Sequence, residues 1–345
     1  MPRFRRCVRG VPAGLLLQVL LLLCPSFAAG PHYQYFRAGN PADVQTKTQG
    51  GFALLGGGDD LDRAFKWMCE RSGGGDFLIL RASGDDDYNP YIQGLCKVNS
   101  VATLILPDRA AAEDPFASAA IRNAEAVFVA GGDQANYINF WMGTPVQQAL
   151  NEAIARNVPI GGTSAGLAVL GEFVYSAQGD APDGPALTSP EALSNPFSPR
   201  VTIVHQFLDN PLLKEVITDT HFSARDRLGR TLVFMARILQ DGKARHIRDI
   251  AVDERTGVLL EPGGMATVIG AGSAYFLQAT QNPETCKANT PLTFRGVTVR
   301  SLHADEPFNV LQWSSSEGTS YTLSVESGAI HSTLPGGAVY TNATK

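Results

Sequence analysis

Residues 158–170 read Val-Pro-Ile-Gly-Gly-Thr-Ser-Ala-Gly-Leu-Ala-Val-Leu, and this stretch decides the fold expected for the chain. A short apolar run leads into Gly162-Thr163-Ser164-Ala165-Gly166 and a helix-like run follows, which predicts a strand, a sharp turn and a helix. The flanking glycines lack the Cβ atoms that would clash in so tight a turn. The pattern therefore predicts a nucleophile elbow with Ser164 at its apex. The alternative is a strand-to-helix turn in which a serine caps the helix.

Short β-type runs alternate with helical patterns before the elbow. Strands are expected at residues 52–55, 77–81, 101–106, 126–129 and 158–161, and helices at about 61–71 and 145–156. The apolar runs are continuous rather than alternating, as in strands that are buried on both faces. The sequence therefore predicts an α/β fold of three layers, with a mostly parallel sheet between two layers of helices.

Polar, glycine-rich turns follow several of these strands, at residues 56–59, 82–85 and 131–134 and at the elbow. In parallel sheets ligands bind outside the carboxyl ends of the strands, so we expect these turns to converge on one crevice. Residues 178–199 are rich in Pro, Gly, Ser and Asp, which predicts an exposed flap beside the elbow.

A second β pattern begins near residue 247. It contains β-type runs at residues 250–252, 258–260, 266–269, 274–277 and 297–301. We expect extra C-terminal strands that extend or edge the sheet, and a further β segment in the tail at about 313–345.

The N-terminus has the order of a secretory signal peptide. Four arginines precede the apolar run 15–23, and the small residues of 26–29 follow it. Cleavage near Ala28 would change the formal charge from −5 to −9, because four arginines leave. We expect a secreted, acidic protein with no nucleic-acid partner and no stable membrane association after cleavage. A membrane anchor is the alternative, although the run is short for a spanning helix.

Three cysteines remain after such cleavage: Cys69, Cys96 and Cys286. In an oxidising compartment at most one internal disulfide can form, and the sequence leaves the pairing open. The spacings do not resemble a zinc site, so no metal is expected.

A serine nucleophile needs a base to take its proton and a third group to orient that base. Among the histidines, His221 stands out because Arg225, Arg227 and Arg230 follow within nine residues. A guanidinium fork is a natural partner for a substrate carboxylate. The alternative is a solvated helix start, in which the arginines pair with Asp219 and Asp226.

Five segments together resemble the cyanophycinase branch of the S51 serine peptidases. They are the elbow, residues 131–134, residues 81–84 continuing to 88–91, residues 219–230 and residues 250–254. The resemblance runs in family order over roughly residues 50–277. It implies a flavodoxin-like or class I glutamine-amidotransferase-like fold that needs neither metal nor organic cofactor and often forms a homodimer. Members cleave bonds beside aspartyl residues.

The resemblance also implies a role for each matching residue. Ser164 would be the nucleophile, His221 the general base and Glu254 the carboxylate that orients it, although Asp253 or a flap carboxylate could replace Glu254. The backbone N–H groups of Ala165 and Gly132 would form the oxyanion hole. The residues expected to line the site and bind substrate are Gln134, Asp219, Arg225, Arg227 and Arg230. Thr220 departs from the family pattern, which more often has glutamine there.

The predicted organisation is a signal peptide at residues 1–28, an N-terminal extension at 29–49, a peptidase domain at 50–280 and a β-rich extension at 281–345. The function implied is cleavage of β-aspartyl–arginine linkages in cyanophycin, through an acyl-enzyme. Two alternatives remain: a general aspartyl or isoaspartyl dipeptidase of the peptidase E type, and a non-catalytic secreted binding protein on the same fold. Intact Ser164, His221 and Glu254 speak against the second. A glutamine amidotransferase is disfavoured because no cysteine lies at the elbow.

Overall fold

Five parallel strands form the centre of the first sheet in this computed structural model, which describes residues 1–2, 31–181 and 184–341. In spatial order they are β4 (Ser100–Ile105), β3 (Asp76–Arg81), β5 (Ala126–Val129), β6 (Ile160–Thr163) and β2 (Phe52–Leu55). The predicted parallel sheet is confirmed. Apart from residues 1–2, the predicted signal segment lies outside the described residues.

Antiparallel strands complete this sheet on both sides. At one edge β1 (Gln34–Gly39) pairs with β4, and on the other side β11 (Thr256–Leu260) pairs with β2. β12 (Met265–Gly270) and β16 (Pro307–Asn309) follow β11. The expectation that C-terminal strands extend the sheet is confirmed for this group.

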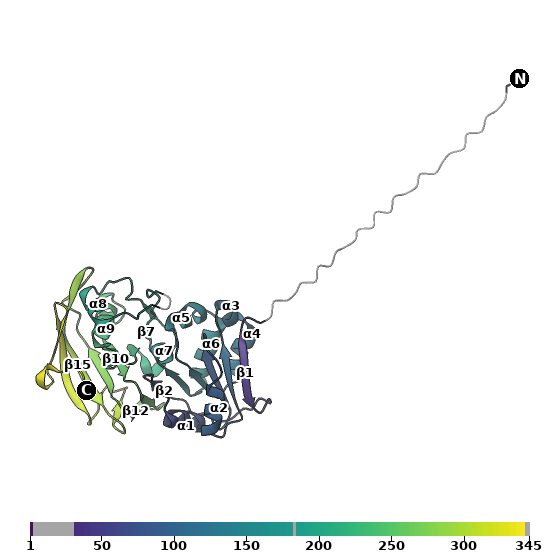
Figure 1. The fold of residues 1–345 in the computed structure, drawn as a ribbon, viewed down its shortest axis with the longest axis horizontal. Helices are drawn as coiled ribbons and strands as arrows, with labels where there is room; N and C mark the ends of the chain where they lie inside the picture. The colour runs from purple at the N-terminus through teal and green to yellow at the C-terminus, as the bar shows by residue number, and fades with distance from the viewer. Residues whose placement is uncertain (3–30, 182–183, 342–345) are drawn as a thin grey trace. The chain divides into compact units, whose positions relative to one another are not determined.

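Helices cover both faces of the parallel strands (Figure 1). Phe77 and Ile79 of β3 belong to one apolar core, with α1 (Asp62–Arg71) and α2 (Tyr88–Leu95). Leu78 and Leu80 belong to the other core, with α4 (Pro115–Arg122) and α6 (Pro145–Ala155). Because successive side chains of a strand point to opposite faces, the continuous apolar runs fill two cores at once. Cys69 of α1 forms a disulfide with Cys96, and the buried Cys286 is a free thiol.

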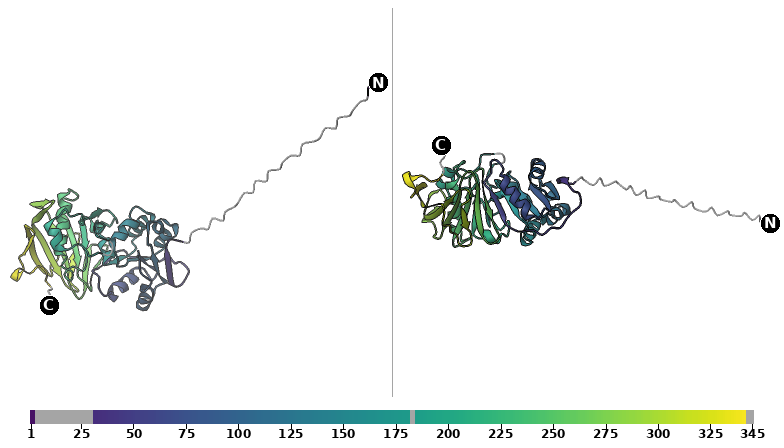
Figure 2. Two further views of the ribbon diagram at one scale, coloured as in Figure 1. Left: turned by 45° about the horizontal axis from the view of Figure 1, so that its top comes forward. Right: turned by 90° about the horizontal axis from the view of Figure 1, so that it is seen from below.

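A second sheet lies beside β2 and β11, and the sequence did not indicate it as separate. Its centre is parallel: β7 (Phe173–Tyr175), β9 (Val216–Asp219) and β10 (Ile247–Val252). Antiparallel strands flank them, and Figure 2 shows this region from two further sides. These strands are β8 (Ile203–His205), β13 (Ala274–Ala279), β14 (Thr285–Lys287), β15 (Thr290–Leu302), β17 (Thr319–Glu326) and β18 (Ala329–Ser332).

The remaining helices are short, except for α9. They are α3 (Arg109–Glu113), α5 (Gln134–Trp141), α7 (Ala165–Ala168), α8 (Ser189–Ser194), α9 (Leu228–Gln240) and the 3₁₀ turns Pro211–Leu213 and Pro335–Gly337. Helix α8 lies inside the predicted flap, so part of that segment is helical. In the described part of the chain, no helix is long and apolar enough to cross a membrane.

Candidate active site

The turn that carries Ser164 has the geometry of a nucleophile elbow. Ser164 follows β6 and precedes α7, with φ 52° and ψ −119°, a backbone conformation that side chains rarely adopt. A Cβ atom on Gly162 would lie 2.5 Å from the carbonyl carbon of Gly166, and one on Gly166 would lie 2.0 Å from the Val129 oxygen. Both glycines are therefore required by close packing, as the sequence predicted.

Three side chains form a continuous hydrogen-bonded line at this turn. Ser164 Oγ lies 2.7 Å from His221 Nε2, and His221 Nδ1 lies 2.6 Å from Glu254 Oε1. Ser164 follows β6, His221 follows β9 and Glu254 follows β10, so the line joins the carboxyl ends of strands from both sheets. A neutral histidine with its hydrogen on Nδ1 donates to Glu254 and accepts the serine O–H, as a general base requires.

The backbone around His221 fixes the position of its ring. Its N–H donates to the Gly56 carbonyl over 2.8 Å, and its φ is 48°. A Cβ atom on Gly57 would lie only 2.4 Å from His221 Cε1, so the glycine makes room for the imidazole. The glycine-rich turn after β2 therefore accepts the backbone hydrogen bond of His221 and leaves room for its ring.

The structure separates the two candidate carboxylates of the predicted triad. Asp253 is buried and accepts from the backbone N–H groups of Ser223 and Ser273, at 2.8 and 3.1 Å. Those bonds hold the loop that follows His221. Glu254, rather than Asp253, contacts the imidazole.

Burial and neighbouring charges tune the histidine. Loss of water lowers the pKa of His221 below its ordinary 6.5, the Glu254 hydrogen bond opposes this, and the positive charges of Arg225 and Arg227 lower it further. The hydrogen bond from His221 lowers the pKa of Glu254. At neutral pH the pair is therefore a neutral imidazole beside a carboxylate, the state from which a base can accept a proton.

A cavity of about 240 Å³ opens beside Ser164. Its lining includes the predicted Gly132, Ala165, Gln134, Arg225, Arg227 and Arg230. Flap residues line it as well: Asp180, Ala181, Gly184 and Ala186. Other hollows of about 290 and 580 Å³ contain none of the predicted site residues. The predicted convergence of loops on one crevice is observed here.

The turn that carries Gly132 is held by a tyrosine. The Tyr137 hydroxyl lies 2.9 Å from the Ala130 oxygen and 3.0 Å from that of Gly131. A Cβ atom on Gly131 would lie 3.6 Å from Ser164 Cβ, so the turn lies against the serine. Tyr137 was not among the predicted residues, because nothing in the sequence connects its helix position with the turn before it.

Asp219 was predicted to bind substrate, but it does not line the cavity. It is 3% exposed, and both its oxygens accept hydrogen bonds from Arg230. Arg230 Nε donates to Oδ2 over 3.0 Å, and Arg230 Nη2 donates to Oδ1. Thr231 Oγ1 and the Thr220 N–H also donate to it, each over 2.8 Å. Burial alone would raise the pKa of Asp219, but the arginines outweigh it and lower it. Asp219 therefore positions an arginine rather than contacting the cavity.

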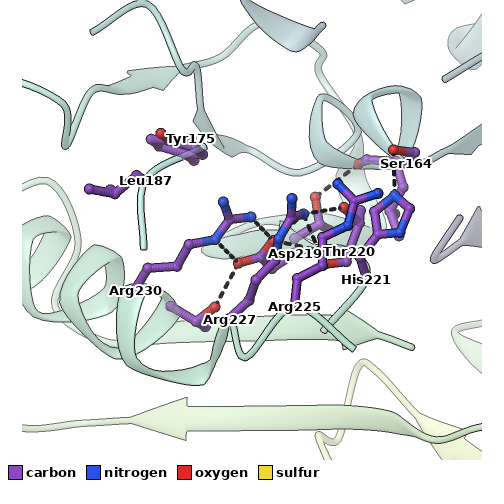
Figure 3. Close-up of polar contacts among 12 residues, drawn as sticks. Ser164, Tyr175, Leu187, Asp219, Thr220, His221, Arg225, Arg227 and Arg230 are labelled. Carbon is purple, nitrogen blue, oxygen red and sulfur yellow. Dashed lines mark hydrogen bonds and ion pairs between the residues drawn. The ribbon is translucent and has the colours of Figure 1, made fainter. Parts of the chain in front are cut away.

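The three arginines differ in their partners (Figure 3). Arg230 is neutralised by Asp219, whereas Arg227 Nη1 donates to the Thr220 hydroxyl and carbonyl, over 2.9 and 3.0 Å. Arg227 lies 3.6 Å from Asp219, and burial, followed by the charge of Arg230, lowers its pKa. Arg225 has an exposed side chain 3.7 Å from Glu254. Arg227 and Arg230 are buried, so they are not part of a solvated helix start.

A flap residue that the sequence analysis missed is Asp180. It accepts from the Tyr175 hydroxyl over 2.9 Å and from Arg200 Nε over 2.8 Å. Arg200 also binds Glu191 of α8. These bonds hold the described part of the flap against the cavity. Among the described residues, no group of three or more His, Cys, Asp or Glu side chains could hold a metal ion.

Comparisons with known proteins place this geometry in a family context. The model of peptidase family S51 matches residues 81–210, which include Gln134 and Ser164 but end before His221 and Glu254. A cyanophycinase of Nostoc sp. is 27% identical over 218 residues, which cover 61% of this chain and 66% of that protein. A cyanophycinase of Synechococcus elongatus is 28% identical over 273 residues, 74% of this chain and 78% of that protein. The chain is similar to cyanophycinases, and part of it matches peptidase family S51.

The match to the Nostoc cyanophycinase spans just under two thirds of that protein's length. Two solved structures are also similar. A peptidase from an acI-B1 Actinobacterium has a TM-score of 0.47 and 17% identity, covering 77% of this chain and 98% of that one. A putative peptidase E protein from Listeria monocytogenes has a TM-score of 0.43 and 12% identity, covering 65% of this chain and 100% of that one.

Proposed function

We propose that the chain is a serine peptidase that cleaves β-aspartyl–arginine linkages of a cyanophycin-like polymer, releasing dipeptides. The observation that carries the proposal is the hydrogen-bonded line from Ser164 through His221 to Glu254, beside a cavity lined by arginines. The similarity to cyanophycinases supplies the substrate class.

The mechanism follows from the positions of these groups. Ser164 Oγ attacks the scissile carbonyl carbon while His221 Nε2 accepts the serine proton. Glu254 holds the Nδ1–H and stabilises the imidazolium that forms. The backbone N–H groups of Ala165 and Gly132 donate to the oxyanion of the tetrahedral intermediate. His221 then gives its proton to the leaving amine, and a water molecule hydrolyses the acyl-enzyme by the same route.

The arginines fit an anionic substrate. The cavity receives positive charge from Arg225, Arg227 and Arg230, and Asp219 compensates Arg230 from behind the cavity. A substrate carboxylate would supply the missing negative charge, and a guanidinium binds it with two parallel hydrogen bonds. Polyaspartate backbones and acidic dipeptides carry such carboxylates, whereas a neutral amide does not.

The second candidate is an aspartyl or isoaspartyl dipeptidase of the peptidase E type. It is favoured by the size of the cavity, about 240 Å³, which suits a dipeptide better than a long polymer segment. On this alternative the triad acts in the same way, and only the accepted substrate changes.

The test is to incubate the purified mature protein with insoluble cyanophycin and with α- and β-linked aspartyl dipeptides, and to identify the products by mass. Ser164→Ala is the matched control. We expect the wild type alone to release β-aspartyl-arginine. Cleavage of only the small peptides would favour the dipeptidase, and no cleavage by the wild type would favour a binding protein.

We further propose that the protein is exported. The support is the order of charged, apolar and small residues at the N-terminus, together with a disulfide between Cys69 and Cys96. Expression of the full chain in a bacterial host tests this, with the N-terminus of the exported protein determined by mass. Cleavage near Ala28 is expected, and an intact N-terminus in the cytoplasm would contradict export.

A further inference from the structure

The C-terminal tail returns to the loop that carries the arginines. The Tyr340 hydroxyl accepts from the Leu228 N–H over 3.1 Å and donates to Asp226 Oδ1 over 3.0 Å. Its ring lies edge-on to Phe222 at 5.6 Å, and Phe222 directly follows His221. One tail residue thus contacts both ends of the loop 222–228, more than a hundred positions away in the sequence.

These contacts bracket Arg227. Asp226 and Leu228 are its two neighbours in the chain, and one hydroxyl binds both of them. Asp226 has φ 46°, a conformation that costs energy in a residue with a side chain, and the Tyr340 contact adds to the backbone hydrogen bonds that hold the loop. The Leu228 N–H belongs to the first turn of α9, where backbone donors have no partner inside the helix. Tyr340 supplies the acceptor.

The tail is itself anchored. Tyr321 of β17 donates its hydroxyl to the Val339 carbonyl over 3.0 Å, and Ser301 Oγ lies 2.6 Å from Thr341 Oγ1. The Tyr340 ring also packs 6.0 Å from Tyr275 of β13. The second sheet therefore anchors both sequence neighbours of Tyr340, Val339 and Thr341.

The guanidinium of Arg227 has a separate partner, Thr220. Nη1 binds Thr220, while no described residue accepts a hydrogen bond from Nε or Nη2. Those donors are available to a ligand in the cavity that Arg227 lines. We propose that Tyr340 is a positioning residue that sets Arg227 for binding of a substrate carboxylate. This inference rests on the proposed function in one respect, the acidic substrate that Arg227 would bind.

The kinetic test compares wild type with Tyr340→Phe, which keeps the ring and removes the hydroxyl. With an acidic dipeptide that the wild type cleaves, we expect KM to rise about fivefold while kcat stays within about twofold, because the weakened contact binds the substrate equally in the ground state and in the transition state. Tyr33→Phe is the control. Tyr33 is half-buried and stacks on Phe116 against the first sheet, so KM and kcat should both stay at wild-type values.

A purely structural role predicts a different pattern. Labelling of Ser164 by phenylmethylsulfonyl fluoride measures the serine and its base without the arginines, and its rate should not change in Tyr340→Phe. An unchanged KM, or a parallel fall in kcat and in the labelling rate, would overturn the positioning role.

A second measurement needs no turnover. The Nε–H of Arg227, assigned by its loss in Arg227→Lys, should exchange with water faster in Tyr340→Phe than in wild type and in Tyr33→Phe. Equal exchange in all three would overturn the inference. If the wild type cleaves none of the substrates, the proposed function fails, and this exchange measurement still decides the role of Tyr340.

Discussion

Two carboxylates bind basic side chains in this site, and they do so under opposite conditions. Glu254 is partly exposed and binds His221, a group that must gain and lose a proton. Asp219 is 3% exposed and binds Arg230, whose charge is permanent. The comparison shows that the catalytic carboxylate, Glu254, stays near solvent, where neighbouring charges can shift the pKa of its partner. The structural carboxylate, Asp219, is buried, and hydrogen-bond donors surround it.

The largest expected effect is on the reactive side of this comparison. His221→Ala removes the base, and we expect kcat to fall by about 10⁴-fold or more, because the serine keeps its proton. The free energy of unfolding, measured by urea denaturation, should change far less than the activation free energy of the reaction. A variant that retained more than about a tenth of wild-type kcat would contradict the role of His221.

Glu254→Gln should lower kcat by about 10²- to 10⁴-fold with little effect on stability, because it leaves His221 without its orienting carboxylate.

Asp219→Asn should act on folding instead. It leaves Arg230 buried without its anion, and such a loss costs about 3–5 kcal/mol. Denaturation and kinetics on both variants measure this contrast. If Asp219→Asn were as stable as wild type, the scaffold role of Asp219 would be wrong.

The elbow and its two glycines were predictable because they depend on residues close together in the sequence, and the parallel sheet was predictable because each of its strands is a continuous apolar run. Ser164, His221 and Glu254 were found through their motifs, and the structure brings these three side chains into contact. The role of Asp219 was not predictable. Its burial depends on the second sheet, whose strands β7 and β9 are four residues long or fewer and give no periodicity. Tyr340 was missed because its partners lie more than a hundred positions away in the sequence.

The pH dependence of kcat/KM sharpens the comparison. Because a general base acts when neutral and burial lowers the pKa of His221, activity should rise with pH through a pKa below 6.5. Arg225→Gln removes a positive charge that contributes to this lowering, so the acidic limb should move to higher pH. A pH profile of kcat/KM for both proteins measures the shift, because kcat/KM reports the free enzyme. A limb that moved to lower pH would show that Arg225 does not act on His221 as proposed.

A third carboxylate affects stability rather than activity. Asp249 of β10 is fully buried, and neither oxygen has a hydrogen-bond partner among the described residues. Burial, and then the charge of Asp219, raise the pKa of Asp249 well above its ordinary value of 3.8. The native state therefore keeps a proton that the unfolded chain has lost. Its stability falls as pH rises from 3.8 toward the raised pKa of the native carboxyl, by up to about 1.4 kcal/mol per pH unit.

Asp249→Asn has no proton to lose and should remove that slope. Denaturation at several values between about pH 5 and pH 7 would compare the two proteins, and the variant should gain on wild type as pH rises. A constant difference in stability across the range would mean that Asp249 is ionised in the native state.

The central claim is that Ser164 is a nucleophile activated by His221. The most direct measurement is peptide mapping by mass spectrometry after treatment with a fluorophosphonate, which forms a stable adduct with activated serines. We predict one adduct, on Ser164, absent from Ser164→Ala and formed far more slowly in His221→Ala. An adduct on another residue, or equal labelling of the His221→Ala protein, would contradict the account.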